Sequence, residues 1–287
     1  MRKLTHFVAA VEERSMTRAA GRLRLSQQAL SMSIRALERE LGTPLLERGR
    51  GGVELLPAGR SLYADGVPLL SAASAAVARA RRAAEGGIEL LRVGHTPAVT
   101  DVDVITMMAG VPTALAAAVM QVVQIPSDDL GDRLWDRSID LGLTRAMSRI
   151  DGITGRVLAR HRLRLAVCSG HRLALREVVH LRDVAAETLV VPAPAYVSGD
   201  TKLLLALLRT AGVEPRYRVT AVQGMPPVTA VLGTDGVALV TDAPGPAVGG
   251  AVQVLELEPS TTVPLVAAWL SDTRSRARDL FLGALPS

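Results

Sequence analysis

The sequence predicts an α/β protein in which an N-terminal winged helix-turn-helix and a long helix precede a larger α/β domain. Three observations predict this order. Residues 15–48 carry two closely spaced helix signals, residues 58–85 form an Ala-rich helical stretch, and the later chain alternates short β-like runs with helical ones. With 287 residues the chain is long enough for two domains with cores of their own, or for three compact lobes.

The two helices within residues 15–48 are marked at their ends. Ser15 and Ser26 are residue types that favour the N-cap, and Gly42 followed by Pro44 ends the second helix. Apolar residues recur at helical spacing between these signals, namely Ala19, Ala20 and Leu23 in the first helix and Leu30, Ile34, Leu37 and Leu41 in the second. Each helix is therefore predicted to bury one stripe.

The second helix has a polar face opposite its apolar stripe. At about 100° per residue this face contains Gln28, Ser31, Met32, Arg35 and Arg39. Because an α-helix fits the major groove, Gln and Arg on such a face can hydrogen-bond base edges, and Met can contact a thymine methyl group. The pattern indicates DNA binding, and a merely solvated helix face stays an alternative at this point.

The flanking residues complete a winged helix-turn-helix over residues 1–57. Leu4, Phe7, Val8 and Val11 predict a preceding amphipathic helix. After Pro44 the run LLERGRGGVEL has two short apolar ends around a Gly/Arg tip, which is typical of a β-wing.

The run FVAAVEERSMTRAAGRLRLSQQALSMSIRALERELGTPLLER resembles the N-terminal domain of LysR-type transcriptional regulators. The resemblance is carried by SMTRAA, LSQ, ALS, the LE and LG pairs and PLLER, and the later VELLPAG resembles the family's strand-to-linker junction. It implies that double-stranded promoter DNA is a partner. The residues expected to bind it are Thr17, Arg18, Ser26, Gln27, Gln28, Ser31, Met32, Arg35, Arg48 and Arg50.

Three positions depart from the family's pattern. The family usually has Pro where Gln28 stands and Arg where Met32 stands, so one guanidinium contact should be missing and the sequence preference altered. In the wing the family often carries its arginine at the position of Gly51, and we expect Arg50 to substitute from next door.

The charge distribution agrees with a nucleic-acid partner for the N-terminal part alone. Residues 1–60 contain 11 Lys and Arg against 6 Asp and Glu, a net charge of +5, whereas the remaining residues contain 22 of each sign. An excess of cations confined to one domain is the electrostatic signature of phosphate binding and predicts salt-sensitive affinity. Residues 61–287, which carry no net charge, are expected to have a function other than DNA binding.

Cysteine content and hydropathy favour a cytoplasmic protein that does not enter a membrane. A single cysteine, Cys168, excludes an intrachain disulfide framework. The N-terminal apolar run is interrupted by Thr5 and His6, so no export signal is predicted. The uncharged residues 104–127 are long enough to span a bilayer, but Gly110 and Pro112 divide them into a helix and a buried strand.

Residues 58–85 predict a helix that needs a partner. Small and apolar residues recur along it at helical spacing, and such a long helix must bury its stripe on something, which a second copy of the chain does most simply. By resemblance this is the linker helix of a homodimer or homotetramer, with a hinge at residues 86–87. Pro68 lacks a backbone N–H and is predicted to kink or interrupt the helix.

The rest of the chain reads as an α/β domain over residues 88–287. Strands are predicted near residues 89–94, 119–125, 139–143, 163–168, 188–191, 216–220, 237–240 and 263–269, and helices near residues 128–137, 201–211, 226–232 and 273–282. The resemblance implies two Rossmann-like lobes of periplasmic-binding-protein type. Lobe I would comprise residues 88–161 and 265–287 and lobe II residues 162–264, with a small-molecule effector between them.

Candidate effector-binding residues follow the strands, because ligands of α/β lobes sit at the carboxyl ends of strands. They are Thr96, Thr100, Ser127, Asp128, Thr144 and Arg145 in lobe I and Gln223 and Thr241 in lobe II. Each of them taken singly is more simply a cap or loop residue. The sequence therefore predicts a site only if these residues converge.

Other functions find less support in the sequence. His161, Cys168 and His171 lack convincing metal-ligand spacing, and no GxSxG nucleophile turn is present, so neither a metal, a cofactor nor an enzymatic activity is expected. Two alternatives stay open: a solute-binding protein or enzyme with an appended winged helix, and a DNA-binding regulator controlled by a protein partner. RNA polymerase is a further candidate partner.

Overall fold

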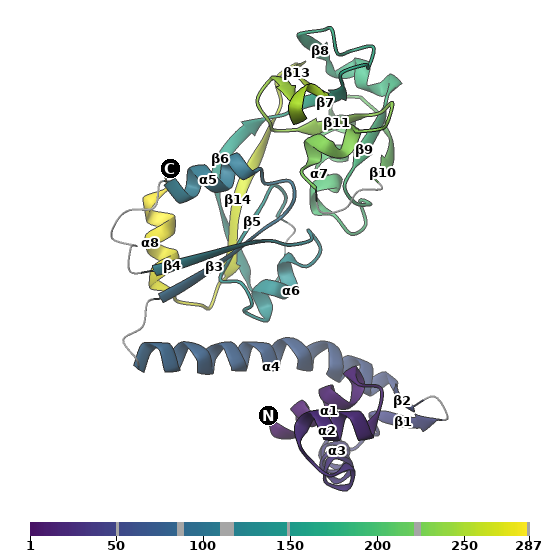
Figure 1. The fold of residues 1–287 in the computed structure, drawn as a ribbon, viewed down its shortest axis with the longest axis vertical. Coiled ribbons are helices and arrows are strands. Elements are labelled where there is room, and N and C mark those ends of the chain that lie inside the picture. Colours follow the sequence, from purple (N-terminus) through teal and green to yellow (C-terminus); the bar gives the residue numbers. More distant parts are fainter. Residues whose placement is uncertain (50–51, 85–88, 110–117, 148–149, 221–224, 286–287) are drawn as a thin grey trace. The chain divides into compact units, whose positions relative to one another are not determined.

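The computed structural model describes residues 1–49, 52–84, 89–109, 118–147, 150–220 and 225–285. The chain forms two compact units, of which the first contains the N-terminal 87 residues and the second most of the rest (Figure 1).

The first unit begins with a winged helix-turn-helix, as predicted. Its elements are α1 (Arg2–Glu12), α2 (Met16–Leu23), α3 (Gln27–Leu41) and the two wing strands β1 (Leu46–Gly49) and β2 (Gly52–Leu55). The strands pair in antiparallel register from Leu46 opposite Leu55 to Gly49 opposite Gly52. The core between the three helices contains Ala19, Ala20, Leu30 and Ile34, because small residues on α2 let α3 approach closely.

One long helix, α4 (Pro57–Ala84), follows the wing and has 28 residues. Its first half packs against the winged domain, where Leu62, Tyr63, Val67 and Leu70 lie against a core of Phe7, Val8 and Leu45. The predicted interruption at Pro68 is wrong, since the helix runs unbroken through this residue. Proline removes only one backbone hydrogen bond, and Val67 and Leu70 on either side of it pack against the core of the winged domain.

Lobe I of the second unit is built on a five-stranded sheet in the order β4-β3-β5-β14-β6. The first three strands are parallel and the last two antiparallel to their neighbours. Phe281 of α8 and Met107 of α5 pack against the sheet core. The bounds are β3 (Glu89–His95), α5 (Asp101–Ala109), β4 (Ala118–Gln124), α6 (Leu130–Trp135), β5 (Leu141–Thr144), β6 (Ile153–Arg162), β14 (Thr262–Leu270) and α8 (Arg276–Ala284).

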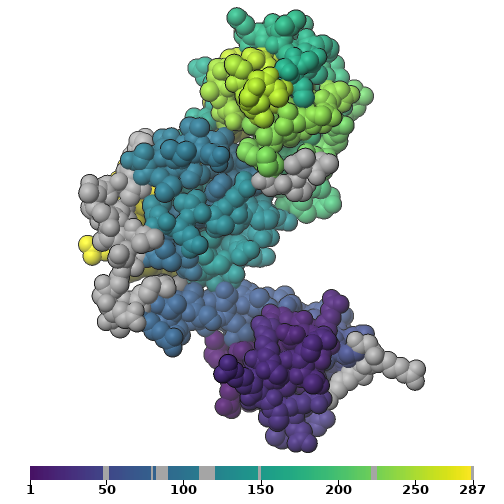
Figure 2. Space-filling view, viewed as in Figure 1, coloured from purple at the N-terminus to yellow at the C-terminus, as the bar shows by residue number. Residues whose placement is uncertain are grey.

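Lobe II has a seven-stranded sheet in the order β10-β9-β11-β7-β13-β12, with β8 paired to β13. Its surface is green to yellow-green in Figure 2, and that of lobe I is blue and teal. The bounds are β7 (Arg164–Cys168), β8 (Val178–His180), η2 (Leu181–Ala186), β9 (Thr188–Val191), α7 (Gly199–Thr210), β10 (Arg216–Val219), η3 (Pro227–Val231), β11 (Val237–Val240), β12 (Gly245–Ala247), η4 (Val248–Gly250) and β13 (Val252–Glu258).

Two adjacent strands connect the lobes. The chain leaves lobe I through β6 and returns through β14, and these strands pair from Thr262 opposite Arg162 to Leu270 opposite Ile153. The ladder continues into the crossing itself, where the N–H of Leu163 donates to the carbonyl of Thr261 at 2.8 Å. Figure 1 shows both strands rising together toward lobe II. The two connections between the lobes are therefore hydrogen-bonded to each other.

All eight predicted strands are present, and the sequence missed four others. β8 and β12 have three residues each, and β6 is an edge strand whose Arg-rich sequence faces solvent along much of its length. The missed β13 alternates apolar and polar residues and could have been found. The predicted helix at residues 226–232 is wrong in type, because η3 is a short 3-10 helix beginning at Pro227.

Candidate functional site

The turn between α2 and α3 fixes how α3 is presented. Arg24 ends α2 in the left-handed conformation with φ of 56°, and the Ser26 hydroxyl accepts the N–H of Ala29 at 3.1 Å to cap α3. Leu30 and Ile34 are buried, which turns the opposite side of the helix outward. Gln28 and Arg35 are exposed there, and Gln27 is exposed in the first turn. The helix N-terminus and one whole face of α3 are therefore available to an external partner.

The outer face of α3 continues into a shallow groove at its C-terminal end. Met32, which is 65% exposed, and Arg35 and Arg39 line this groove together with residues 42–44. Glu38 fixes its floor, because the carboxylate accepts the N–H of Leu45 at 2.9 Å and that of Leu46 at 3.3 Å. Glu38 thus joins the end of α3 to the beginning of the wing.

A second cluster of charged residues lies at the start of α2. Arg18 donates to the carbonyl oxygen of Glu13 and its Nε lies 3.7 Å from the carboxylate of the same residue. Arg22 bridges Glu12 at 2.6 Å and Glu13 at 3.4 Å. These pairs hold the exposed guanidinium groups against α1, next to the exposed Thr17.

The wing is held close to the helices at one glycine. Gly52 has φ of 114°, and a Cβ added there would lie 2.5 Å from the carbonyl oxygen of Arg14. The neighbouring Val53 donates its N–H to the same oxygen at 3.3 Å. No other residue type fits this approach without a shift of the backbone. Arg48 lies on β1, and the predicted Arg50 lies outside the described residues.

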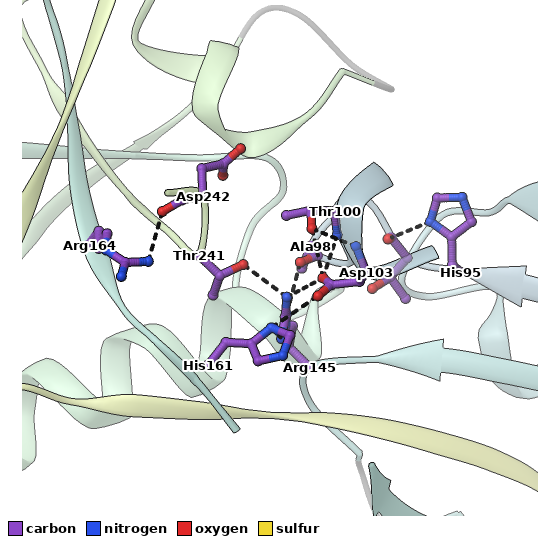
Figure 3. Close-up of polar contacts among 10 residues, drawn as sticks. His95, Ala98, Thr100, Asp103, Arg145, His161, Arg164, Thr241 and Asp242 are labelled. Atoms are coloured by element: carbon purple, nitrogen blue, oxygen red, sulfur yellow. Dashed lines mark hydrogen bonds and ion pairs between the residues drawn. The ribbon is translucent and has the colours of Figure 1, made fainter. Parts of the chain in front are cut away.

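In the second unit, Arg145 is the centre of a buried polar network between the lobes (Figure 3). Its side chain is 4% exposed and pairs with the carboxylate of Asp103. It also donates to the carbonyl oxygen of Ala98 at 3.1 Å and to Nδ1 of His161 at 2.9 Å. The fourth partner, the hydroxyl of Thr241 at 2.9 Å, belongs to lobe II. Arg145 therefore links the two lobes directly.

Asp103 is fixed from both sides. The N–H and the hydroxyl of Thr100 both donate to Oδ2 at 2.9 Å, which makes a cap at the beginning of α5. Nδ1 of His161 lies 3.0 Å from Oδ1, and this nitrogen can either donate to Asp103 or accept from Arg145. Burial, followed by the charge of Arg145, lowers the pKa of His161, which favours the neutral ring.

Asp200 makes the second polar link between the lobes. It is the second residue of α7 in lobe II and is only 4% exposed. Its carboxylate accepts the hydroxyl of Ser127 at 3.1 Å and lies 3.5 Å from the hydroxyl of Thr144, both in lobe I. Burial raises the pKa of Asp200, and hydrogen bonds from Ser127 and from the backbone of Arg145 oppose that rise.

An apolar pocket opens beside this network. It is small, with a cavity volume of about 40 Å³, and its walls include Leu163, Pro192, Leu204 and Val240. Its polar lining consists of Thr100, Arg145, Asp200, Thr201, Thr241 and Asp242. Burial raises the pKa of Asp242, whose carbonyl oxygen accepts from Arg164 at 3.0 Å. The pocket combines apolar walls with a few polar groups, as small-molecule sites do.

The structure places the predicted effector residues in two groups. Thr100, Arg145 and Thr241 meet in the network beside the apolar pocket. Ser127 and Thr144 meet around Asp200, and Thr96 is fully buried nearby. Asp128 is exposed and lines a hollow together with Ser127, Thr144 and Asp200. Gln223 lies outside the described residues.

The sequence analysis did not predict that four titratable residues belong to the cleft. They are Asp103, His161, Asp200 and Asp242. One signal was available, because the spacing of Thr100 and Asp103 is that of a capping pair at a helix start. His161 does not meet His171, which instead lies 3.5 Å from Glu187. Among the described residues no cluster of three or more His, Cys, Asp or Glu could hold a metal ion.

A winged helix-turn-helix followed by a long helix and a two-lobed domain with a polar cleft defines a DNA-binding regulator with a ligand-binding domain. Comparison with protein-family models agrees. Residues 1–60 match the bacterial regulatory helix-turn-helix proteins of the lysR family, and residues 84–286 match the LysR substrate binding domain. The chain belongs to the LysR family and is a LysR-type DNA-binding transcriptional regulator with an effector-binding domain.

Individual relatives support this over the whole chain. The transcriptional regulator TfdS of Cupriavidus pinatubonensis is 32% identical over 286 residues, which cover 98% of this chain and 96% of the relative. BudR of Raoultella terrigena is 30% identical over 216 residues, which cover 75% and 74%. Within the described part of this chain, no helix is long and apolar enough to cross a membrane.

Solved structures share the fold. The LysR family regulator CbnR has a TM-score of 0.73 at 23% identity, with 99% of this chain and 97% of CbnR covered. CbnR has also been solved in a complex with its target DNA. Full-length BenM has a TM-score of 0.56 at 24% identity, with 99% and 94% covered.

Proposed function

We propose that this regulator reads its operator with the N-terminal half of α3. The supporting observation is that Gln28 and Met32 are exposed on the outer face of a helix whose other face is buried, and that Gln27 is exposed in the first turn of this helix. Gln side chains in the first turns of such a helix reach base edges in the major groove. Ser26, Ser31 and Arg35 flank them on α3, and Thr17 and Arg18 lie at the start of α2, where they can contact phosphates.

The wing is assigned a different role. In the sequence Arg48 and Arg50 alternate with the glycines of the tip, and arginines on a wing bind phosphates and the minor groove. Arg50→Ala should therefore weaken binding to all sequences alike and reduce the salt slope of log K by about one. A loss confined to one base position would instead assign Arg50 to direct base reading.

The inter-lobe cleft is proposed to bind a small-molecule effector. The network of Arg145 contacts both lobes and lines the apolar pocket, so a ligand there would alter contacts in both lobes. A ligand that binds one lobe arrangement better than another shifts the population toward it. Thr96, Thr100, Ser127, Asp128, Thr144, Thr241 and Gln223 remain the further candidate contacts.

Two exposed apolar surfaces support a homo-oligomer, either a dimer or a tetramer. On α4, Leu69 and Val77 are 55% and 52% exposed. On α5, Val102, Ile105 and Met108 recur every three residues and are 71%, 64% and 43% exposed. Such stripes on helices are buried by partner subunits in assemblies. A dimer would present two winged helices to two half-sites. RNA polymerase is proposed as a further partner at the promoter.

Sequencing of the DNA fragments retained by the purified protein tests the DNA-binding assignment. We expect a two-fold symmetric or pseudo-symmetric motif, since half-site spacing mirrors the symmetry of the protein. Retention of fragments without a shared motif would contradict sequence-specific binding.

A thermal-shift screen of metabolites tests the effector assignment, because a ligand that binds only the folded state raises the melting temperature. Ligands whose effect disappears in Thr241→Val would support the cleft. If no metabolite acts and DNA binding changes only when a protein is added, regulation by a protein partner is the better reading. Turnover of a binding metabolite would instead favour an enzyme with an appended winged helix.

A further inference from the structure

Asp200 of lobe II inserts its carboxylate among hydrogen-bond donors of lobe I. The carboxyl group accepts from the hydroxyl of Ser127 at 3.1 Å, and the hydroxyl of Thr144 lies 3.5 Å away. The backbone of Arg145 acts to lower the pKa of this carboxyl group. The residue is 4% exposed, so these protein groups replace the water that an exposed carboxylate would bind. The contact is made by donors of lobe I and an acceptor of lobe II.

These donors stand where an α/β lobe binds anions. Ser127 follows β4, and Thr144 ends β5, with the backbone N–H of Arg145 directly after it. Thr96 follows β3, which lies between β4 and β5 in the sheet. The three strands are parallel, so their carboxyl ends meet at one edge of the sheet. Ligands of open α/β sheets bind at this edge.

Thr96 supplies a second, independent observation. Its side chain is fully buried, and its Oγ1 is a buried side-chain oxygen with no hydrogen-bond partner among the described residues. The hydroxyl nevertheless lies near enough to Asp200 to stabilise the ionised carboxyl and so to lower its pKa. A buried polar atom without a hydrogen-bond partner calls for an explanation, and an unfilled place in a ligand site is one.

Among the described residues no cation forms an ion pair with Asp200, although the charge of Arg145 acts on it. Arg145, the cation that acts on it, is bonded to Asp103, His161 and Thr241. The buried carboxylate is therefore held by neutral hydroxyl and amide donors, as a bound anion would be. Burying a carboxylate without a paired cation costs free energy, which hydrogen bonds from the protein must offset.

We propose that Asp200 is an intramolecular carboxylate ligand that fills an anion-binding site in lobe I and holds the two lobes together without an effector. This inference rests on the proposed function of the cleft. The site takes a carboxylate of formate size, which is what Asp200 carries beyond its β carbon. In the native chain Asp200 occupies these donors, so an effector carboxylate reaches Ser127 and Thr144 only by displacing Asp200.

Replacement of Asp200 by Ala, with formate added back, tests this in the full-length protein. The variant should melt several degrees lower than the native protein and have a larger radius of gyration in solution scattering. Formate should restore both properties along a saturable curve, acetate should act less well, and chloride at equal ionic strength should have no effect. The native protein and a matched variant of an exposed aspartate, Asp272→Ala, should not respond to formate.

A saturable formate response of Asp200→Ala alone supports the proposal. Equal scattering of native protein and variant, together with no specific formate effect, overturns it. If Asp200→Ala does not fold, the variant Ser127→Ala with Thr144→Val leaves Asp200 in place and removes two donors. That variant should also be expanded, and a native radius of gyration in it overturns the proposal.

Binding of DNA by the same variants separates this inference from the proposed function. A formate response that leaves DNA affinity unchanged upholds the anion site and contradicts the coupling between cleft and DNA. An absent formate response, combined with a metabolite that acts through the pocket, contradicts the role of Asp200 and leaves the effector function standing.

Discussion

The outer face of α3 and the inter-lobe cleft use polar side chains in opposite ways. On α3, Gln28 and Arg35 are exposed, and no described residue hydrogen-bonds to their side chains. In the cleft, Arg145 and Asp103 are almost fully buried and pair with each other. They also form hydrogen bonds with Thr100, Ala98 and Thr241. One surface therefore keeps its hydrogen-bonding capacity for a partner, and the other uses most of it to join the two lobes.

The difference predicts where substitution costs stability and where it costs recognition. A buried pair that loses one member leaves an uncompensated charge, whereas an exposed side chain can be removed with little effect on folding. Variants in the cleft should therefore unfold more easily, and variants on α3 should fold normally and select different DNA.

Asp103→Ala is expected to have the largest effect. It leaves the guanidinium of Arg145 buried without its carboxylate and should lower the free energy of unfolding by about 3–5 kcal/mol. Urea denaturation measures this. The double variant Asp103→Leu with Arg145→Met should be less destabilised than the single variant, because it removes both charges. If the free energy of unfolding of the single variant falls by less than about 1 kcal/mol, the pair of Arg145 and Asp103 contributes no more than an exposed ion pair does.

Glu38→Ala should have the next largest effect and tests whether a polar residue of α3 that is bonded within the protein behaves like the residues of the cleft. It removes the acceptor of two backbone N–H groups, at Leu45 and Leu46, and should lower the stability of the winged domain by about 1–3 kcal/mol. Urea denaturation of the full-length protein measures this. Glu40→Ala is the control, because Glu40 is an exposed residue of the same helix that pairs only with Lys3. Equal losses in both variants would contradict the role given to Glu38.

Gln28→Ala should leave folding unchanged and alter recognition. We expect discrimination at one base position to fall by about 1–3 kcal/mol, because an exposed Gln in the first turns of α3 reads a base edge bidentately. Selection from a randomised operator library measures the preference at each position. A uniform loss across all sequences would place Gln28 on phosphates instead, and unchanged selectivity would remove it from the interface.

The two regions also differ in how far the sequence could predict them. The helix-turn-helix is local, since Ser15, Ser26 and Gly42 are caps whose signals lie within the segment they terminate, and the structure has all three in those roles. The cleft depends on contacts between residues far apart in the chain. Thr144 and Asp200 are 56 positions apart and Arg145 and Thr241 are 96. Strand-end reasoning could nominate each threonine, but no periodicity links it to its partner.

Asp200 illustrates the limit. At the start of a helix an aspartate is ordinarily explained by the helix dipole, and nothing in the neighbouring sequence distinguishes this one. Its role follows from the packing of α7, whose Leu205 and Leu208 enter the core of lobe II and so set the direction of the first turn. Only the folded structure brings that turn to Ser127 of lobe I.

Thr96→Val should have the smallest effect and sharpens the comparison most. A buried hydroxyl without a hydrogen-bond partner is a cost to folding, and Val has nearly the same shape. We expect the free energy of unfolding to stay the same or to rise by up to about 1 kcal/mol, as the small favourable interaction with Asp200 is lost at the same time.

Thr201→Val is the matched control in lobe II. Thr201 is equally buried, but its hydroxyl donates to the carbonyl oxygen of Ala193 at 2.8 Å, so its loss should destabilise by about 1–3 kcal/mol. If Thr96→Val is as destabilised as Thr201→Val, the hydroxyl of Thr96 has a partner of its own, and the cleft contains no spare donor.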